Sequence, residues 1–317
     1  MSPQKILDGL HPYEYEHPFD SKALGLVQGT PGLDAVIRQF HKHGIERLST
    51  VQYTGSNLRI RPESYPKIYT LLDRVCNILN MPDRPNLYLK PGDLRPDSEF
   101  PVGIDSPIVI LTSEEIKSLT DDELLYVIGR EMGHIKSQHT LYHAMAQFFP
   151  AFTDVVGQAT FGIGKLVSSP LQLALQRWSR MSKLTADRAG LLSCQNFETA
   201  IKVMMKWAGL PDGYFDDMKL KSFLDQAKKF EELDFDLFNK ALKFYLGISN
   251  THPWIVVRSA ELLKWVESGE YQQVLDRQTV IKQYIRFEDT LQFCRNCNYR
   301  LRGTEKFCNS CGQQLRS

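Results

Sequence analysis

Apolar side chains recur at three- and four-residue steps through the middle of the chain, the spacing of one face of an α-helix. The clearest run lies between Asp121 and His139, where the recurring positions are Leu124, Val127, Ile128, Met132 and Ile135. Thr120 and Glu123 have the spacing of a capping box, in which each side chain bonds the backbone N–H of the other residue. The pattern therefore predicts a helix that begins just after Thr120.

The same periodicity predicts further helices on both sides of this run, together with a few short strands. The expected helices are one that begins near Gly32 and ends near Gly44, Pro66 to Leu79, a short one capped by Thr112 and Glu115, one that begins at Pro170 and ends near Leu192, Phe197 to Trp207, Phe235 to Tyr245, and Val256 to Glu267. The expected strands are Ser56 to Ile60, Leu87 to Leu89 and Ile108 to Leu111. Many helices and one small sheet indicate an α+β fold that is mostly helical.

Length and charge leave room for a large core and provide no general attraction to nucleic acid or to anionic membranes. The chain has 317 residues and a formal charge of +1. Its first ten residues contain no apolar run typical of a signal peptide, so we expect a cytoplasmic protein. The weakly charged segment Thr140 to Gln176 lacks about 20 consecutive apolar residues. It is expected to form a helical hairpin that is buried or lies on a surface, without a membrane span.

We expect three parts along the chain: an N-terminal arm at 1–60, a main domain at 61–285 and a small C-terminal module at 286–317. Within the arm, the aromatic and proline residues between His11 and Pro18 are expected to lie over a surface of the main domain. Tyr13 and His17 are also a conceivable ligand pair, although packing of the arm explains them more simply.

Four of the six cysteines form the C-terminal module. They are Cys294, Cys297, Cys308 and Cys311, two C-x-x-C pairs that together predict a zinc ribbon with one structural zinc. A module of this size has little core, so the metal would supply much of its folding free energy. Basic and aromatic residues around the pairs also leave open a contact with nucleic acid. Cys76 and Cys194 are expected to be small buried apolar residues.

The helix after Thr120 carries Arg130, Glu131 and His134, a spacing that resembles the H-E-x-x-H motif of zinc peptidases. In that motif two histidines bind the metal and the glutamate activates a water molecule. Two further segments match in the same order: Ser179-Arg180 with Lys183 to Asp187, and His252-Pro253 followed by Arg258. Together, from about Pro62 to Leu263, the chain resembles the HtpX-like and CAAX-prenyl-protease-like gluzincin metallopeptidases, and within them a soluble bacterial branch with an N-terminal arm and a zinc-ribbon tail.

This resemblance implies a metal site with two positions changed. The first histidine ligand corresponds to Arg130 and the glutamate ligand to Lys183, which leaves His134 as the only matching ligand beside Glu131, a vestigial general base. The resemblance gives Asp187 the role of orienting the first histidine from outside the ligand shell. It places His252 and Arg258 among the contacts to the substrate and the transition state.

Two cations at ligand positions exclude a catalytic zinc. Arginine has no lone pair to donate, and at an effective dielectric constant of about 20 each like charge costs a doubly charged ion on the order of 5 to 8 kcal/mol at roughly 4 to 6 Å. We therefore expect no catalytic zinc. Arg130 is expected to pair with Asp187 and Lys183 with Glu131, because unpaired buried carboxylates are costly.

We predict a catalytically inactive pseudo-peptidase that binds a peptide or protein partner, by strand addition or as the inactive partner of an active paralogue. One alternative is an active zinc endopeptidase with an altered metal site. His139 and His143, four residues apart on the same predicted helix, are conceivable replacement ligands, but packing explains them better because no third ligand is evident. A second alternative is a nucleic-acid-associated factor that acts through the zinc ribbon.

Overall fold

The computed structural model describes residues 4–29, 45–94, 101, 107–146, 163–232 and 254–277. The first half of this part contains η1 (Pro12–Glu14), α1 (Pro18–Gln28), α3 (Ile45–Ser56), β1 (Leu58–Ile60), α4 (Pro66–Ile78), β2 (Asn86–Lys90), β3 (Ile108–Thr112) and α5 (Ser113–Ser118). The second half contains α6 (Asp121–Lys136), α8 (Ile163–Cys194), α9 (Phe197–Trp207), α10 (Asp217–Glu232), α12 (Ile255–Glu267) and α13 (Glu270–Leu275). The prediction of a mostly helical fold with one small sheet is confirmed.

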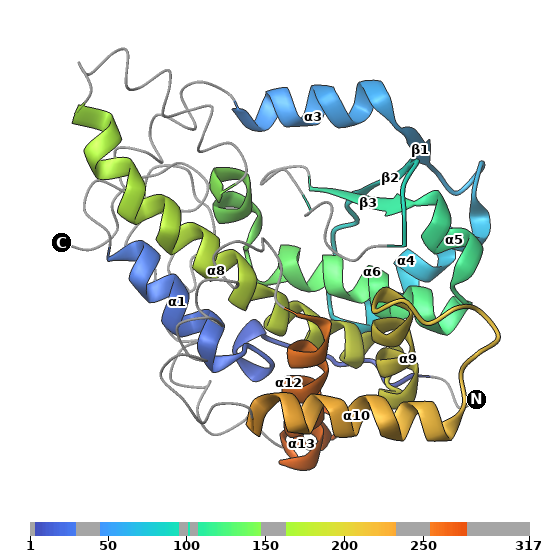
Figure 1. The fold of residues 1–317 in the computed structure, drawn as a ribbon. Coiled ribbons are helices and arrows are strands. Elements are labelled where there is room, and N and C mark those ends of the chain that lie inside the picture. The colour runs from blue at the N-terminus through green and yellow to red at the C-terminus, as the bar shows by residue number, and fades with distance from the viewer. Residues whose placement is uncertain are drawn as a thin grey trace.

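The sheet has the strand order β1-β2-β3, with β1 antiparallel and β3 parallel to β2. Leu87 pairs with Ile60 on one side and with Val109 on the other, and all three side chains are buried. The parallel β2–β3 pair is joined by a connection that contains no helix among its described residues. The sheet lies on one side of α6, and α9, α10 and α12 lie on the other side (Figure 1).

The pair α6 and α8 forms the centre of the molecule and makes the most extensive contact between any two described elements. Thr120 and Glu123 form the predicted capping box at the start of α6, and Thr112 and Glu115 form the one at the start of α5. Every residue of α6 from Glu123 to His134 is buried. Such a helix needs partners on all sides, and it obtains them from α4, α8 and α9. Buried side chains of β2 and β3 belong to the same hydrophobic core.

Glycines let α6 and α8 approach each other closely. A Cβ on Gly129 would lie 2.2 Å from Ser193 Oγ, and a Cβ on Gly133 would lie 2.4 Å from Ala189 Cβ. Both distances are well inside van der Waals contact, so no larger residue fits without displacing α8. The close approach brings the polar side chains of the two helices within hydrogen-bonding distance of one another.

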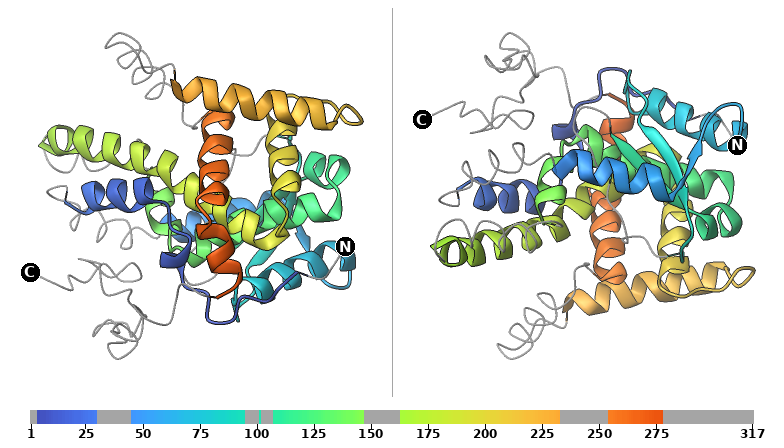
Figure 2. Two further views of the ribbon diagram at one scale, coloured as in Figure 1. Left: turned by 90° about the horizontal axis from the view of Figure 1, so that it is seen from below. Right: turned by 90° about the horizontal axis from the view of Figure 1, so that it is seen from above.

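The N-terminal segment is an integral part of this packing. Leu7, Leu10 and Tyr15 belong to the main hydrophobic core, and α1 runs alongside α8, as both views in Figure 2 show. His17 lies just before α1: its Nδ1 accepts from the Phe19 N–H and caps the helix, and its Nε2 lies 2.9 Å from Glu261 Oε2. The segment between His11 and Pro18 therefore contributes to the interior as well as lying over the surface.

Several helix boundaries differ from the sequence-based expectation. The helix α8 begins at Ile163, so Pro170 is inside it and not at its first turn, as we had expected. The helices α1, α3 and α10 had no predicted counterpart; α10 is largely exposed, and exposed helices carry a weak apolar pattern. The helices predicted from Gly32 to about Gly44 and from Phe235 to Tyr245 lie outside the described residues.

Candidate functional site: two polar clusters between α6 and α8

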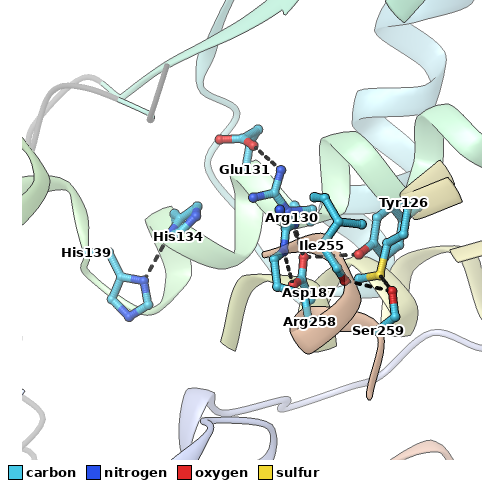
Figure 3. Close-up of polar contacts among 10 residues, drawn as sticks. Tyr126, Arg130, Glu131, His134, His139, Asp187, Ile255, Arg258 and Ser259 are labelled. Carbon is cyan, nitrogen blue, oxygen red and sulfur yellow. Dashed lines mark hydrogen bonds and ion pairs between the residues drawn. The ribbon is translucent and has the colours of Figure 1, made fainter. Parts of the chain in front are cut away.

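A buried group of charged side chains joins α6, α8 and α12. Arg130 Nε lies 3.0 Å from Asp187 Oδ1, and Arg130 Nη1 lies 3.3 Å from Glu131 Oε1. Arg258 binds the same aspartate with two hydrogen bonds, from Nε to Oδ2 at 2.7 Å and from Nη2 to Oδ1 at 2.6 Å. Figure 3 shows these side chains converging on Asp187. We call Arg130, Glu131, Asp187 and Arg258 the charged cluster.

Aromatic residues enclose the charged cluster. The Tyr126 hydroxyl donates to Asp187 Oδ1 at 3.0 Å, and burial raises the pKa of Tyr126 well above its ordinary value, so the phenol keeps its proton. The guanidinium carbons of Arg130 and Arg258 lie 5.1 and 5.2 Å from the ring centroid of Trp207. Cation–π contacts of this kind stabilise arginine charges that have lost their water.

The structure shows where the predicted site residues of the charged cluster lie. Arg130 pairs with Asp187, as expected from the resemblance to the gluzincin motif, and it also reaches Glu131, the residue that was expected to face Lys183. Arg130 and Lys183 are both buried, and neither points to solvent. The pairing of Lys183 with Glu131 remains a prediction. Arg258 is fully buried against Asp187 and thus faces the interior.

One turn further along α6, three buried histidines meet. His134 Nδ1 lies 3.0 Å from His139 Nδ1, and one ligand atom from each of His134, His139 and His143 lies within 4.8 Å of the other two. All three rings are at most 2% exposed. We call this group the histidine cluster; its His134–His139 contact is drawn in Figure 3.

The histidine cluster corrects two expectations. His139 and His143 do not share the helix of His134, because α6 ends at Lys136 and the chain turns at Ser137 and Gln138 before a helical segment at 140–146. Gln138 has a φ of 57° in this turn, a left-handed conformation that sequence patterns do not signal for glutamine. The turn folds His139 back toward His134, so the third histidine that seemed to be missing is His134 itself.

Neighbouring elements hold the rings of the histidine cluster in place. Asp20 of α1 places Oδ2 3.2 Å from His139 Nε2, and the same oxygen accepts from Thr185 Oγ1 at 2.5 Å. The nitrogens Nδ1 and Nε2 of His143 lie 3.2 and 3.0 Å from the hydroxyls of Ser179 and Ser182, respectively.

Burial keeps two of the imidazoles uncharged. It lowers the pKa of His134 and of His143 well below the ordinary value, and repulsion among the histidines lowers both further. Arg130 and Lys183 act in the same direction on both rings, with a smaller effect. At neutral pH each of these rings therefore has a nitrogen lone pair, the form of histidine that binds metals.

Other predicted site residues lie outside the described part of the chain. His252 and the four cysteines Cys294, Cys297, Cys308 and Cys311 are among them. The zinc ribbon, its structural zinc and the division of the chain into three parts therefore remain predictions. Cys76 and Cys194 are buried free thiols, as expected, and burial raises their pKa values to about 11 and about 12.

Comparisons with known proteins agree with the class of fold that the α6–α8 pair suggests. The model of peptidase family M48 matches residues 66–266. A curated protein from Arabidopsis thaliana, the chloroplastic plastoglobule-localized metallopeptidase 48, is 26% identical over 279 residues, which cover 87% of this chain and 78% of the relative. No solved structure matches this chain significantly.

The fold and its central helix pair thus define a gluzincin-type metallopeptidase domain. This chain belongs to peptidase family M48, whose members are zinc-dependent. No helix in the described residues is long and apolar enough to cross a membrane. Arg130 and Lys183 do not fit a zinc site with the ligands of this family, since both are cations and both are buried between the helices that would hold the ion.

Proposed function

We propose that this protein is a catalytically inactive member of peptidase family M48 that binds a protein or peptide partner. One observation carries the proposal: Arg130 is buried in contact with both Glu131 and Asp187. In the family pattern these three positions belong to a metal ligand, the general base and the residue that orients the ligand. Here a guanidinium group supplies the positive charge among them, and it has no lone pair to bind zinc.

The ion pair also affects the general base. A carboxylate that activates water must accept a proton from that water. Glu131 Oε1 lies 3.3 Å from Arg130 Nη1, so this carboxylate is paired with a buried guanidinium group. The residue that would be the base is thus engaged in a structural ion pair.

The surface that remains for a partner includes the edge of the sheet. Within the described part of the chain, β3 pairs with a strand on only one side, and Ile110 at its centre is partly exposed. An edge strand can bind an extended peptide through backbone hydrogen bonds. We infer that the partner is an extended segment of protein, and an active paralogue is one candidate.

An active endopeptidase with an altered metal site is a second candidate, because His134, His139 and His143 together offer three ligand atoms. A nucleic-acid-associated role through the zinc ribbon remains a third hypothesis, tested by salt-dependent binding to single-stranded nucleic acid. The cytoplasmic location also remains a prediction.

Reversion of the two changed ligands tests the proposal. We expect the zinc-loaded native chain not to cleave unfolded casein. The double variant Arg130→His with Lys183→Glu should gain a zinc ion and measurable cleavage, because it restores two histidines and a glutamate beside Glu131. The single variant Arg130→His is the matched control, since Lys183 remains. Cleavage by the native chain that stops in Glu131→Gln would overturn the proposal.

Partner binding needs its own measurement. A photo-crosslinking residue at Ile110 should capture an unfolded casein chain without cleaving it, whereas the same residue at Met218, which is 82% exposed on α10, should not. Equal capture at both positions would contradict recognition at the edge of the sheet.

A further inference from the structure

The histidine cluster is a group of metal-binding side chains displaced by about one helical turn from the positions discussed above. Its members come from the end of α6, the turn after it and the next helical segment. Three histidines are a common ligand set for a zinc ion, which adds a water or another ligand as the fourth. We propose that His134, His139 and His143 form a site for a late first-row divalent metal ion such as zinc.

The separation of the ring nitrogens suits an ion. Two ligands at about 2.0 to 2.1 Å from a tetrahedral zinc lie about 3.3 Å apart, and His134 Nδ1 and His139 Nδ1 are 3.0 Å apart. All three ligand atoms lie within 4.8 Å of one another. Without an ion, the contact between His134 Nδ1 and His139 Nδ1 is a hydrogen bond in which one ring donates to the other. An ion that binds both nitrogens displaces that proton and draws the set together toward the spacing of about 3.3 Å.

Neighbouring side chains surround the ring nitrogens of the histidine cluster. The carboxylate of Asp20 lies 3.2 Å from His139 Nε2 in an ion pair and places negative charge beside that ring. Ser182 gives its hydroxyl hydrogen to the carbonyl of Ser179, so it accepts from His143 Nε2 and leaves the lone pair on His143 Nδ1. The Ser179 hydroxyl lies 3.2 Å from this Nδ1 and donates to it, so an ion bound there takes the place of that hydrogen bond. A carboxylate behind a ligating histidine is the usual support of such sites.

Charge also favours this location over the family position. The Asp20 carboxylate is fully buried beside His139 and partly balances the charge of an ion. The guanidinium of Arg130 is directed instead toward Asp187 and Trp207. Arg130 and Lys183 still repel a positive charge on the rings of His134 and His143, and the Asp20 carboxylate opposes that repulsion at the histidine cluster. This proposal requires no peptidase activity and is independent of it.

Metal titration of the full-length chain tests the site. Cobalt added to the native chain should produce visible absorption from a nitrogen-ligated ion, and this signal should persist in Cys294→Ser, which removes only a predicted ribbon ligand. It should vanish in His143→Gln. Asp20→Asn keeps the size of the side chain and its bond from Thr185, and we expect it to weaken binding by about 10- to 100-fold. Circular dichroism confirms that each variant is folded.

The variants distinguish this site from the family site. Loss of the bound ion in His139→Gln and His143→Gln, with retention in Lys183→Gln, supports the proposal. The proposal is wrong if a variant at His134 loses the ion while His139→Gln and His143→Gln both keep it. It is also wrong if the native chain binds no metal outside the ribbon cysteines. Cleavage of casein by the native chain would refute the pseudo-peptidase proposal alone, because the metal readout is scored without any substrate.

Discussion

The charged cluster and the histidine cluster lie one turn apart between the same two helices, yet they satisfy their buried polar groups differently. In the first, Arg130 and Arg258 neutralise Glu131 and Asp187 through direct ion pairs. In the second, burial keeps His134 and His143 neutral, and a carboxylate from α1 supports His139. The comparison teaches that charged side chains paired with one another leave no ligand position for a metal ion. Neutral imidazoles keep lone pairs that can bind one.

Removing the common acceptor of the charged cluster should have the largest effect. Asp187→Ala leaves the guanidinium groups of Arg130 and Arg258 buried without their shared partner. Loss of one member of a buried ion pair costs about 3 to 5 kcal/mol. We expect the free energy of unfolding, measured with urea, to fall by that amount.

The matched change in the histidine cluster should cost much less. Ser182→Ala removes only a neutral hydroxyl from His143 Nε2, and we expect a loss of about 1 kcal/mol. If the two variants had similar costs, the distinction between a charged and a neutral cluster would be wrong.

The close approach of the helices underlies both clusters and gives the next prediction. Gly129→Ala places a methyl group 2.2 Å from Ser193 Oγ, so α6 and α8 must separate. Overpacking of this kind costs about 1 to 3 kcal/mol. The control is Gly25→Ala in α1, where an added Cβ meets nothing within 4 Å. Because alanine has a higher helix propensity than glycine, this change should stabilise the protein by up to about 1 kcal/mol. Equal thermal midpoints for the two variants would contradict this packing.

The smallest effect concerns the docking of α1, which supplies Asp20 to the histidine cluster. Burial alone would raise the pKa of Glu261, but hydrogen bonds from His17 and Lys264 lower it to about 2. A carboxyl group whose pKa is lower in the folded state stabilises the fold above its ordinary pKa of about 4.5, and this stability is lost as the pH falls toward 2.

Because solvent partly screens this carboxylate, we expect a contribution of about 1 kcal/mol. Between pH 5 and pH 2, the free energy of unfolding should fall by about 1 kcal/mol less in Glu261→Gln than in the native chain. An unchanged pH profile would mean that the contact between His17 and Glu261 does not hold α1 in place.

The fold was largely predictable because its central helices carry strong local signals. Capping boxes at Thr112 and Thr120 marked the starts of α5 and α6, and β-branched residues marked β3. The start of α8 was missed because a proline usually begins a helix and does not continue one. The amphipathic helix α10 was missed because much of it is exposed.

The candidate site was predictable only in part, and again the missed part lacked a clear local sequence signal. The contact between Arg130 and Asp187 was expected from the resemblance to the gluzincin motif and from the cost of a buried carboxylate. The histidine cluster could not be predicted, because it depends on the left-handed turn at Gln138 and on Asp20, which is far away in the sequence. Three histidines at positions 134, 139 and 143 were the available signal, and reading them as one continuous helix obscured it.

The most direct measurement is an anomalous difference map at the zinc edge from crystals of the native chain soaked in zinc. The account predicts no peak between Arg130 and Lys183, and an intact contact from Arg130 to Glu131 and Asp187. A zinc peak bound to His134 at that position, with Glu131 turned toward a water on the ion, would contradict it.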